Sequence, residues 1–294
     1  MAQSIGLVTK FQPILDEVYK GASVTSILDT PSKPVDFAGA NIVKIFTTDP
    51  IGLATYSRAT GYVAGQVVGA WYTLTLATER GREFNIDRMD DEESLGMAFG
   101  TLAGEFMRTE VAPEIDAYRF AKYASWSAIS TTTGATLTSS TVLAAIDAAS
   151  LQLDTDEVPP EGRKLFVSSG VGKMIDAAVT RMLSTENSVD RTLKMLDNMQ
   201  IIRVPQTRFY TVCTLNSGSG GVDAGGFANA GVGINFMLIH PSAVLQVMKH
   251  ANLKIFTPDE NQDMDTYKVQ YRLYHDAFVY TNKVDGVYLH KLAA

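Results

Sequence analysis

Hydrophobic and polar positions alternate along several short stretches of the chain, and each of these stretches predicts a β-strand. The segment 42–48 (IVKIFTT) predicts a strand. The segment 71–87 predicts two strands joined by a turn at ERGR, which together form a hairpin. Further strands are expected at 164–168, 199–205, 234–239 and repeatedly from Tyr267 to the end. The chain is therefore expected to mix such strands with helices.

One long helix is expected at 92–126. Acidic residues at its start suit the positive end of the helix dipole, and aromatic residues hold one face of its first turns. A proline inside the pattern removes one backbone hydrogen bond, so it should kink or end the helix. The residues that mark this helix are Asp90, Glu93, Phe99, Phe106 and Pro113. Shorter helices are expected at 142–153, at 171–182 and from Pro241 to Met248.

Two segments have little core-forming pattern. Residues 1–34 carry apolar side chains at helical spacing but are interrupted by prolines, which is typical of an arm that packs on something else. Residues 49–69 contain several glycines and two tyrosines, and so long a connection tends to be functional or disordered. A single compact subunit could not easily bury these two segments together with the unusually long helix.

The composition excludes several classes of protein. Hydrophobic residues make up 46% and charged residues 19%, so the chain can bury a core. Its net charge of −7 argues against a dedicated nucleic-acid binder and a basic membrane-surface protein. The single cysteine, Cys213, excludes an internal disulfide framework. No window approaches the ~20 apolar residues that a membrane span needs.

The search for catalytic chemistry nominates nothing. The four histidines lack metal-ligand spacing. His275 and Asp276 are neighbours in an expected strand, so their side chains should point to opposite faces. The glycine-rich run at 216–233 has no lysine for a phosphate loop. The carboxylates of 87–93 could hold a divalent cation, but a helix start balanced by arginines is commoner. No catalytic residue, cofactor or metal is expected.

Several segments together resemble the major capsid protein of tailed bacteriophages, with the Hong Kong 97-like fold. The segments that carry the resemblance are ATYSRATGYVAGQVVGAWYTLTLATERGREFNIDRMDDEESLGMAFG, EFMRTEVAPEIDAYRFAKYA, VPPEGRKLFVSS, IIRVPQTRFYT, INFMLIHPSAV and YRLYHDAFVYTNKVDGVYLH. The resemblance implies an α+β fold with a peripheral and an axial domain. It implies an N-terminal arm at 1–34, a peripheral strand at 35–48, an extended loop (hairpin) at 49–88, the spine helix at 89–128, the axial domain at 129–250 and peripheral return strands at 251–294.

The resemblance also implies a function. Such subunits form hexamers and pentamers that close into an icosahedral shell around genomic DNA, bound without sequence specificity. The implied location is the virion capsid, assembled in the host bacterial cytoplasm, with no membrane. A portal protein and an optional decoration protein are implied partners. The family-like pattern begins almost at residue 1, so we expect no removable scaffolding segment and a separate scaffolding protein instead.

The extended loop is where contacts between subunits are expected, because aromatic and arginine side chains dominate protein interfaces. The expected contact residues are Tyr56, Arg58, Tyr62, Trp71, Arg80 and Arg82. Some members of the family link subunits covalently through a lysine in this loop. Residues 50–78 contain no lysine, so a non-covalent shell is expected. Two other interpretations stay open: an encapsulin-type nanocompartment shell of the same fold, and a soluble α/β enzyme without an identifiable site.

Overall fold

The computed structural model describes residues 23–29, 36–37, 41–89, 104–134, 136–179, 193–218 and 225–293. The chain divides into two compact units. Residues Lys33–Thr78 form the first, which we call the hairpin unit. Residues Met1–Ser32 and Glu79–Ala294 form the second, which we call the body. The two units are described separately below.

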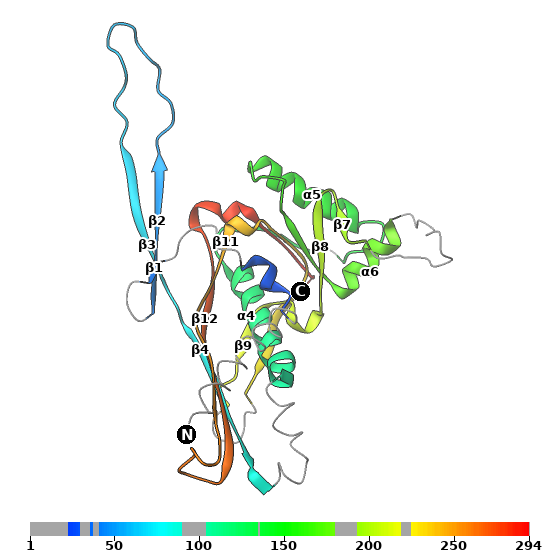
Figure 1. Cartoon of the computed structure of the whole chain (residues 1–294). Helices are drawn as coiled ribbons and strands as arrows, with labels where there is room; N and C mark the ends of the chain where they lie inside the picture. Colours follow the sequence, from blue (N-terminus) through cyan, green and yellow to red (C-terminus); the bar gives the residue numbers. More distant parts are fainter. Residues whose placement is uncertain are drawn as a thin grey trace, which may run out of the picture. The chain divides into compact units, whose positions relative to one another are not determined.

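The hairpin unit is a three-stranded antiparallel sheet in the order β1-β2-β3. Its strands are β1 (Asp36–Phe37), β2 (Ile42–Pro50) and β3 (Val67–Thr75). The pairing of β2 with β3 runs from Ile42 opposite Thr75 to Pro50 opposite Val67. Beyond these pairs the two strands open into the loop 51–66 (Figure 1). The predicted strand at 42–48 is confirmed.

The hairpin expected at 71–87 is wrong. Strand β3 pairs with β2, whereas the next strand, β4 (Thr78–Asp87), belongs to another sheet beside β12. The expected ERGR turn lies inside β4. A Cβ on Gly81 would lie 3.1 Å from the carbonyl oxygen of Tyr271 in β12, so this glycine permits a close backbone approach instead of a turn.

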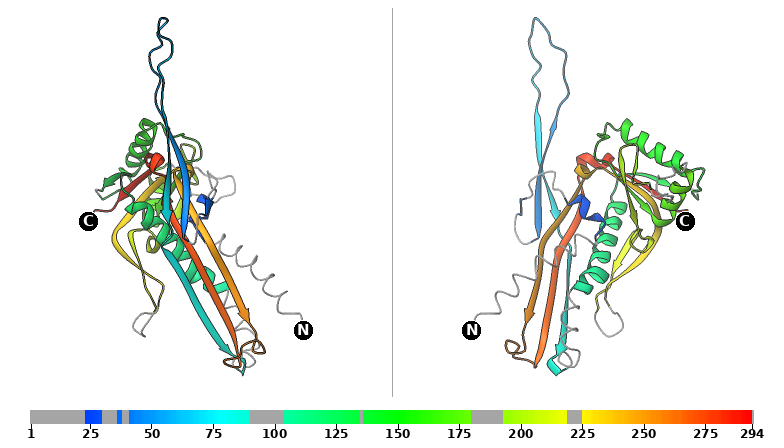
Figure 2. Two further views of the ribbon diagram at one scale, coloured as in Figure 1. Left: turned by 90° about the vertical axis from the view of Figure 1, so that its left-hand side faces the viewer. Right: turned by 45° about the vertical axis from the view of Figure 1, so that its right-hand side comes forward.

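The body contains a three-stranded sheet in the order β11-β12-β4, whose long strands run side by side (Figure 2). Its other strands are β11 (Val244–Phe256) and β12 (Thr266–Val279). The helix expected from Pro241 to Met248 is wrong. Only the short 3-10 turn η4 (Pro241–Ala243) is helical, and β11 continues through residue 250. Antiparallel pairing of Val244–Phe256 with β12 overrides the helical spacing of three apolar residues.

The second sheet of the body has seven strands. Its order is β5-β13-β10-β6-β8-β7, with β9 paired to β10 off this path. The pairs β6–β8 and β13–β5 are parallel, and the pairs of β10 with β6, β9 and β13 are antiparallel. The strands are β5 (Ser130–Thr133), β6 (Lys164–Ser168), β7 (Met195–Leu196), β8 (Met199–Val204), β9 (Tyr210–Leu215), β10 (Phe227–Ile239) and β13 (Val287–Lys291). The strands expected at 164–168, 199–205 and 234–239 are confirmed.

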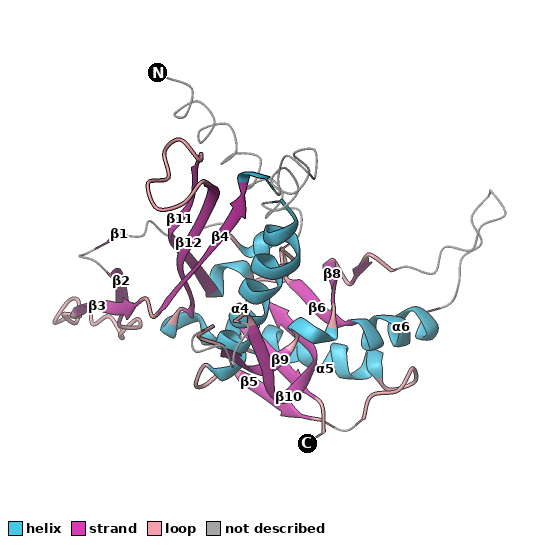
Figure 3. Ribbon diagram, turned by 90° about the horizontal axis from the view of Figure 1, so that it is seen from below, coloured by secondary structure: helices cyan, strands magenta, loops and turns pink. Residues whose placement is uncertain are grey.

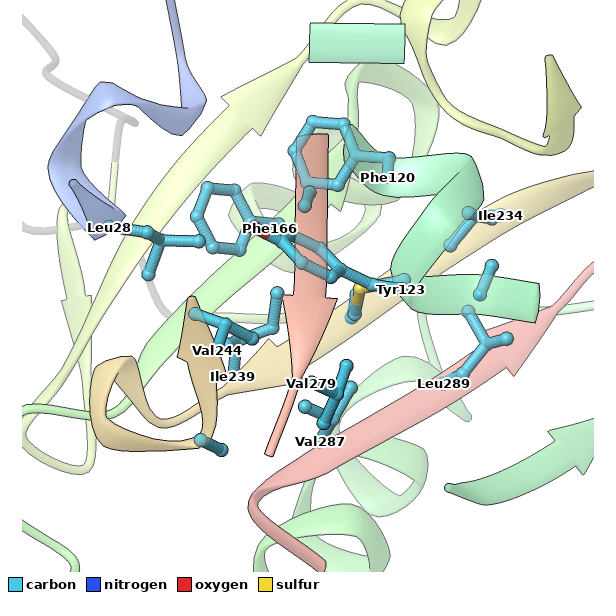
Figure 4. Close-up of a cluster of buried hydrophobic side chains, with 14 of the residues drawn as sticks. Leu28, Phe120, Tyr123, Phe166, Ile234, Ile239, Val244, Val279, Val287 and Leu289 are labelled. Carbon is cyan, nitrogen blue, oxygen red and sulfur yellow. The ribbon is translucent and has the colours of Figure 1, made fainter. Parts of the chain in front are cut away.

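Helices pack on both faces of this sheet (Figure 3). Helices α5 (Val142–Thr155) and α6 (Ser169–Ala178) cover one face of the sheet. There they pack on Leu165 and Val167 of β6 and on Phe236 and Leu238 of β10. Phe166, Met237 and Ile239 point to the other face and pack with Phe120, Tyr123 and Leu28 (Figure 4). Because neighbouring residues of a strand face opposite ways, one run of apolar residues serves both cores. The remaining short helical turns are η1 (Thr25–Leu28), η3 (Gln206–Arg208) and η5 (Thr281–Gly286).

The long helix continues through Pro113. Its described part begins at residue 104, widens into the π-helical turn η2 (Met107–Val111) and continues as α4 (Ala112–Ser125). In η2 the amide of Ala112 donates to the carbonyl of Met107, five residues earlier. A proline leaves one carbonyl without an amide partner, and a wide turn just before it accommodates this loss. Pro113 therefore does not end the helix.

Candidate functional site: an exposed hairpin tip and an anchored helix

The tip of the hairpin unit is a preformed turn. Ser57 and Gly61 exchange backbone hydrogen bonds in both directions, and the Ser57 hydroxyl accepts from the amides of Ala59 and Thr60. Directly outside this turn, the rings of Tyr56 and Tyr62 pack at 4.9 Å between centroids. Local hydrogen bonds of this kind hold a loop in one conformation and so lower the entropy lost on binding. We call residues 56–62 the knob.

The knob is exposed although it is rich in aromatic and apolar surface. Tyr56 is 56% exposed, Tyr62 is 91% exposed and Arg58 also faces solvent. Leu53, in the same loop, is fully exposed. Several large exposed apolar side chains in one loop are typical of an interaction site. The exposed large hydrophobic residues of this unit are Phe46, Ile51, Leu53, Tyr56, Tyr62, Val63, Val67, Trp71 and Tyr72.

Trp71 lies on β3, in the paired part of the hairpin. It is 59% exposed and packs on Phe46, its register partner on β2, with the ring centroids 5.1 Å apart. A Cβ on Gly69 would lie 2.5 Å from the Phe46 ring. The absence of a side chain at position 69 therefore leaves room for this ring. The ring of Trp71 is thus fixed on one side and open to solvent on the other.

Arg80 forms its contacts within the body. Its guanidinium donates to both carboxylate oxygens of Glu114, at 2.7 and 3.1 Å, and to the carbonyls of Asn216 and Gly226 at 2.7 and 3.0 Å. Asn216 and Gly226 flank the connection between β9 and β10, and the Asn216 amide donates to the Gly226 carbonyl. Arg80 therefore ties β4, α4 and this connection together. Sequence spacing offers no signal for this pairing.

Arg82 lies beside the same connection. Its Nη1 atom is 3.0 Å from the position that a Cβ on Gly218 would take and 3.3 Å from that on Gly225. Both glycines have positive φ angles, +67° and +83°, which side chains rarely adopt. Arg80 and Arg82 thus lie together in the body, whereas Tyr56, Arg58, Tyr62 and Trp71 lie in the hairpin unit.

Asp116 on α4 anchors residues 23–25, which lie within the expected arm at 1–34. Its fully buried carboxylate accepts from the hydroxyls of Ser23 and Thr25, each at 2.7 Å, and from the amides of Val24 and Thr25 at 2.9 and 3.1 Å. Arg208 donates to the second oxygen at 3.2 Å. The sequence analysis missed this network, because its members lie far apart in the chain.

The expected residues of the long helix are only partly described. Asp90, Glu93 and Phe99 lie outside the described residues. Phe106 packs edge-on against Phe84 of β4 at 4.9 Å and against Tyr271 of β12 at 6.1 Å. It therefore joins the helix to the three-stranded sheet.

The buried titratable groups serve packing. Burial, with the charges of Arg119 and Arg80, lowers the pKa of His275 to about 3, so the ring stays neutral against Tyr118. Asp276 accepts from the Tyr118 hydroxyl at 2.9 Å. Burial and the nearby Glu114 raise the pKa of the Cys213 thiol to about 11, which disfavours a thiolate nucleophile.

Among the described ranges, no three histidine, cysteine, aspartate or glutamate side chains gather as a metal site would require. The described helices also include none that is long and apolar enough to cross a membrane. The described residues therefore offer no set of ligands for a metal.

No family model and no curated protein matches the chain. Solved structures do match. A structure from Mycobacterium phage Che8 superposes with a TM-score of 0.60 at 17% identity, covering 86% of this chain and 85% of the other. The capsid of the cyanophage P-SCSP1u superposes with a TM-score of 0.61 at 12% sequence identity, and the match covers 87% of this chain and 85% of the other. A virus-like particle from Pyrococcus furiosus superposes with a TM-score of 0.55 at 11% sequence identity, and the match covers 94% of this chain and 95% of the other.

Most of the similar structures come from tailed phages, and the match spans the mixed helix and sheet architecture described above. Similarity at these identities establishes the fold. The fold expected from the resemblance is confirmed: the chain has the Hong Kong 97-like fold of tailed-phage major capsid proteins.

Proposed function

We propose that this chain is the major capsid protein of a tailed bacteriophage, a structural and non-enzymatic subunit that assembles with copies of itself into an icosahedral shell. The observation that carries the proposal is the exposed hairpin: an ordered tip with two tyrosines and an arginine, on a unit whose aromatic surface faces solvent. The similar phage structures support it.

The detailed map belongs to the proposal. In it, residues 1–34 are the N-terminal arm, 49–88 the extended loop and 89–128 the spine helix. Residues 129–250 are the axial domain, and 35–48 with 251–294 complete the peripheral domain. The anchoring of Ser23 and Thr25 on α4 through Asp116 supports an arm that is attached to the body at residues 23–25.

The proposed shell forms from hexamers and pentamers, encloses double-stranded DNA without reading its sequence, and assembles in the cytoplasm of the bacterial host. Its proposed partners are a separate scaffolding protein, a portal protein and an optional decoration protein. The net charge of −7 suits a wall along which DNA must slide, because like charges prevent the DNA from adhering.

Electron microscopy of the purified chain over a range of concentrations, alone and with its scaffolding protein, tests the proposal. Closed shells should appear above a threshold concentration, because assembly from many weak contacts depends on mass action. A chain that sediments as a single subunit at every concentration, with and without the scaffolding protein, contradicts it.

An encapsulin-type nanocompartment is the second candidate. The match to a virus-like particle from Pyrococcus furiosus, which covers nearly the whole of both chains, keeps this candidate open beside the phage capsid. The contents of particles from the natural source distinguish the two. Nuclease-protected DNA supports the phage capsid, and a protein cargo without DNA supports the nanocompartment. For the third interpretation, a soluble enzyme, the described residues offer no group of three histidine, cysteine, aspartate or glutamate side chains that could hold a catalytic metal ion.

A further inference from the structure

The body contains a pocket of about 390 Å³ where β4, the helical residues 105–115 and the β9–β10 connection meet. Its floor is aromatic, because Phe106 packs edge-on against Phe84 and Tyr271, with ring centroids 4.9 and 6.1 Å apart. A concave aromatic surface with a few polar groups around it is the usual form of a small-molecule site. The pocket therefore has the size and the lining of a site for a small organic ligand.

The charged side chains that line the pocket leave one negative charge in excess. Three carboxylates and two guanidinium groups line it, and they belong to Glu105, Glu110, Glu114, Arg80 and Arg82. Arg80 holds both carboxylate oxygens of Glu114, so these two charges cancel. Glu105 and Glu110 are exposed at the rim and outweigh the single charge of Arg82. A ligand with one positive charge would make this lining neutral.

A wide turn of the helix places both rim carboxylates at the pocket. In a regular α-helix, residues five apart are turned by about 140° from each other. The π-helical turn Met107–Val111 has more residues per turn, which brings residues five apart toward one side. Glu105 and Glu110 both line the pocket. The local departure from α-helical geometry thus gives the pocket its acidic rim.

An organic cation suits this lining better than a metal ion does. In the part of the chain that the structure describes, no three histidine, cysteine, aspartate or glutamate side chains gather closely enough to ligate a metal. The faces of phenylalanine and tyrosine rings, in contrast, attract ammonium and amidinium groups. The same rings bury the apolar part of such a molecule. The aromatic floor and the acidic rim therefore favour a ligand that is both cationic and apolar.

We propose that this pocket binds a small organic cation in which one ammonium or amidinium group is attached to a flat aromatic ring. The cationic group lies against the carboxylates of Glu105 and Glu110. The aromatic ring packs on Phe84, Phe106 and Tyr271. All five residues belong to the body of one chain, so the site needs no second subunit and does not depend on the proposed function.

Three probes separate the contribution of the charge from that of the ring. Benzamidine carries both, benzamide keeps the ring and the shape without the charge, and acetamidine keeps the charge without the ring. Each probe is titrated into the full chain, kept too dilute to assemble, and its NMR signals report binding. Benzamidine should bind with a Kd on the order of 1 mM, as suits so small a molecule, and about tenfold more tightly than either other probe. Added salt should weaken its binding, because exposed charges are screened.

Two pairs of variants locate the site. Glu110→Gln removes one rim charge and should weaken benzamidine binding about fivefold, whereas Glu161→Gln, exposed elsewhere in the body, should leave it unchanged. Thr109→Trp fills the pocket and should abolish binding. Thr155→Trp is its matched control, because both threonines are exposed on a helix and donate to the carbonyl four residues earlier. Circular dichroism checks the folding of each variant.

Several results overturn the inference. One is benzamide binding as tightly as benzamidine, which removes the role of the charge. Another is Thr109→Trp binding benzamidine as tightly as Thr155→Trp, which places the ligand elsewhere on the chain. Should Thr109→Trp fail to fold, Glu110→Gln decides, and an unchanged affinity in that variant contradicts the site. Absence of benzamidine binding to the unaltered chain also contradicts it. A chain that forms no shells but binds benzamidine as expected refutes the proposed function alone.

Discussion

The hydroxyl of Ser23 donates a hydrogen bond of 2.7 Å to the buried carboxylate of Asp116, ninety-three positions later in the chain. With Thr25 and Arg208, it surrounds that carboxylate with donors. The network holds residues 23–25 against α4. A single buried side chain thereby joins two segments of the body that lie far apart in the sequence.

Replacing this carboxylate should destabilise the body. In Asp116→Ala, the hydroxyls of Ser23 and Thr25 and the guanidinium of Arg208 lose their acceptor, which should lower the free energy of unfolding by about 3 kcal/mol. Urea unfolding of the unassembled subunit measures the change. Asp147→Ala, at an exposed position of α5, should change it by less than about 0.5 kcal/mol. Equal stability of the two variants contradicts the anchoring role.

Arg80 should resist replacement even by lysine. Its planar guanidinium serves Glu114 and two carbonyls at once, which an ammonium group cannot do. Arg80→Lys should lower the free energy of unfolding by about 2 kcal/mol and speed hydrogen exchange at the Asn216 amide. Arg272→Lys, at an exposed ion pair with Glu79, is the control. Unchanged exchange at Asn216 would show that the connection is held by other contacts.

The stability of the subunit should fall in acid partly through His275. Its pKa is about 3 in the folded chain against an ordinary value of 6.5, so the unfolded chain binds the proton more readily. Stability from this group is therefore full above pH 6.5 and is lost as the pH falls toward 3, by up to about 1.4 kcal/mol per pH unit.

Urea unfolding between pH 7 and pH 4 checks this pH dependence. His275→Phe keeps a ring against Tyr118 and should flatten the slope, whereas His250→Gln, at an exposed position, should leave a slope close to that of the unaltered chain. An unchanged slope in His275→Phe assigns the acid sensitivity to other groups.

Mature particles should hold together without covalent links through the extended loop. Residues 50–78 contain no lysine that could form an amide bond with a neighbouring chain. Boiling in detergent should therefore release subunits that migrate as single chains in a denaturing gel. A ladder of higher bands, with linked peptides from residues 50–78 in its mass spectrum, contradicts the prediction.

Local patterns in the sequence determined most of the elements. Strand β6 was predicted at 164–168 because its apolar residues are continuous, and α5 because Val142, Ile146, Ala149 and Leu153 recur at helical spacing. The fold was predicted from the order of several family-like segments and is confirmed by the similar phage structures. Tyr56, Tyr62 and Arg58 were nominated because they are aromatic or arginine residues in the extended loop that the resemblance implies, and their contacts with other subunits stay a prediction.

Only the tertiary structure decided how the elements pair. The helical spacing after Pro241 and the glycine in ERGR were both misleading, because β12 pairs with Val244–Phe256 on one side and with β4 on the other. The same holds for Asp116 with Ser23 and for Arg80 with Glu114. Hydrogen bonds and strand pairs between distant residues depend on where the folded chain brings them, and periodicity along a sequence carries no information on that.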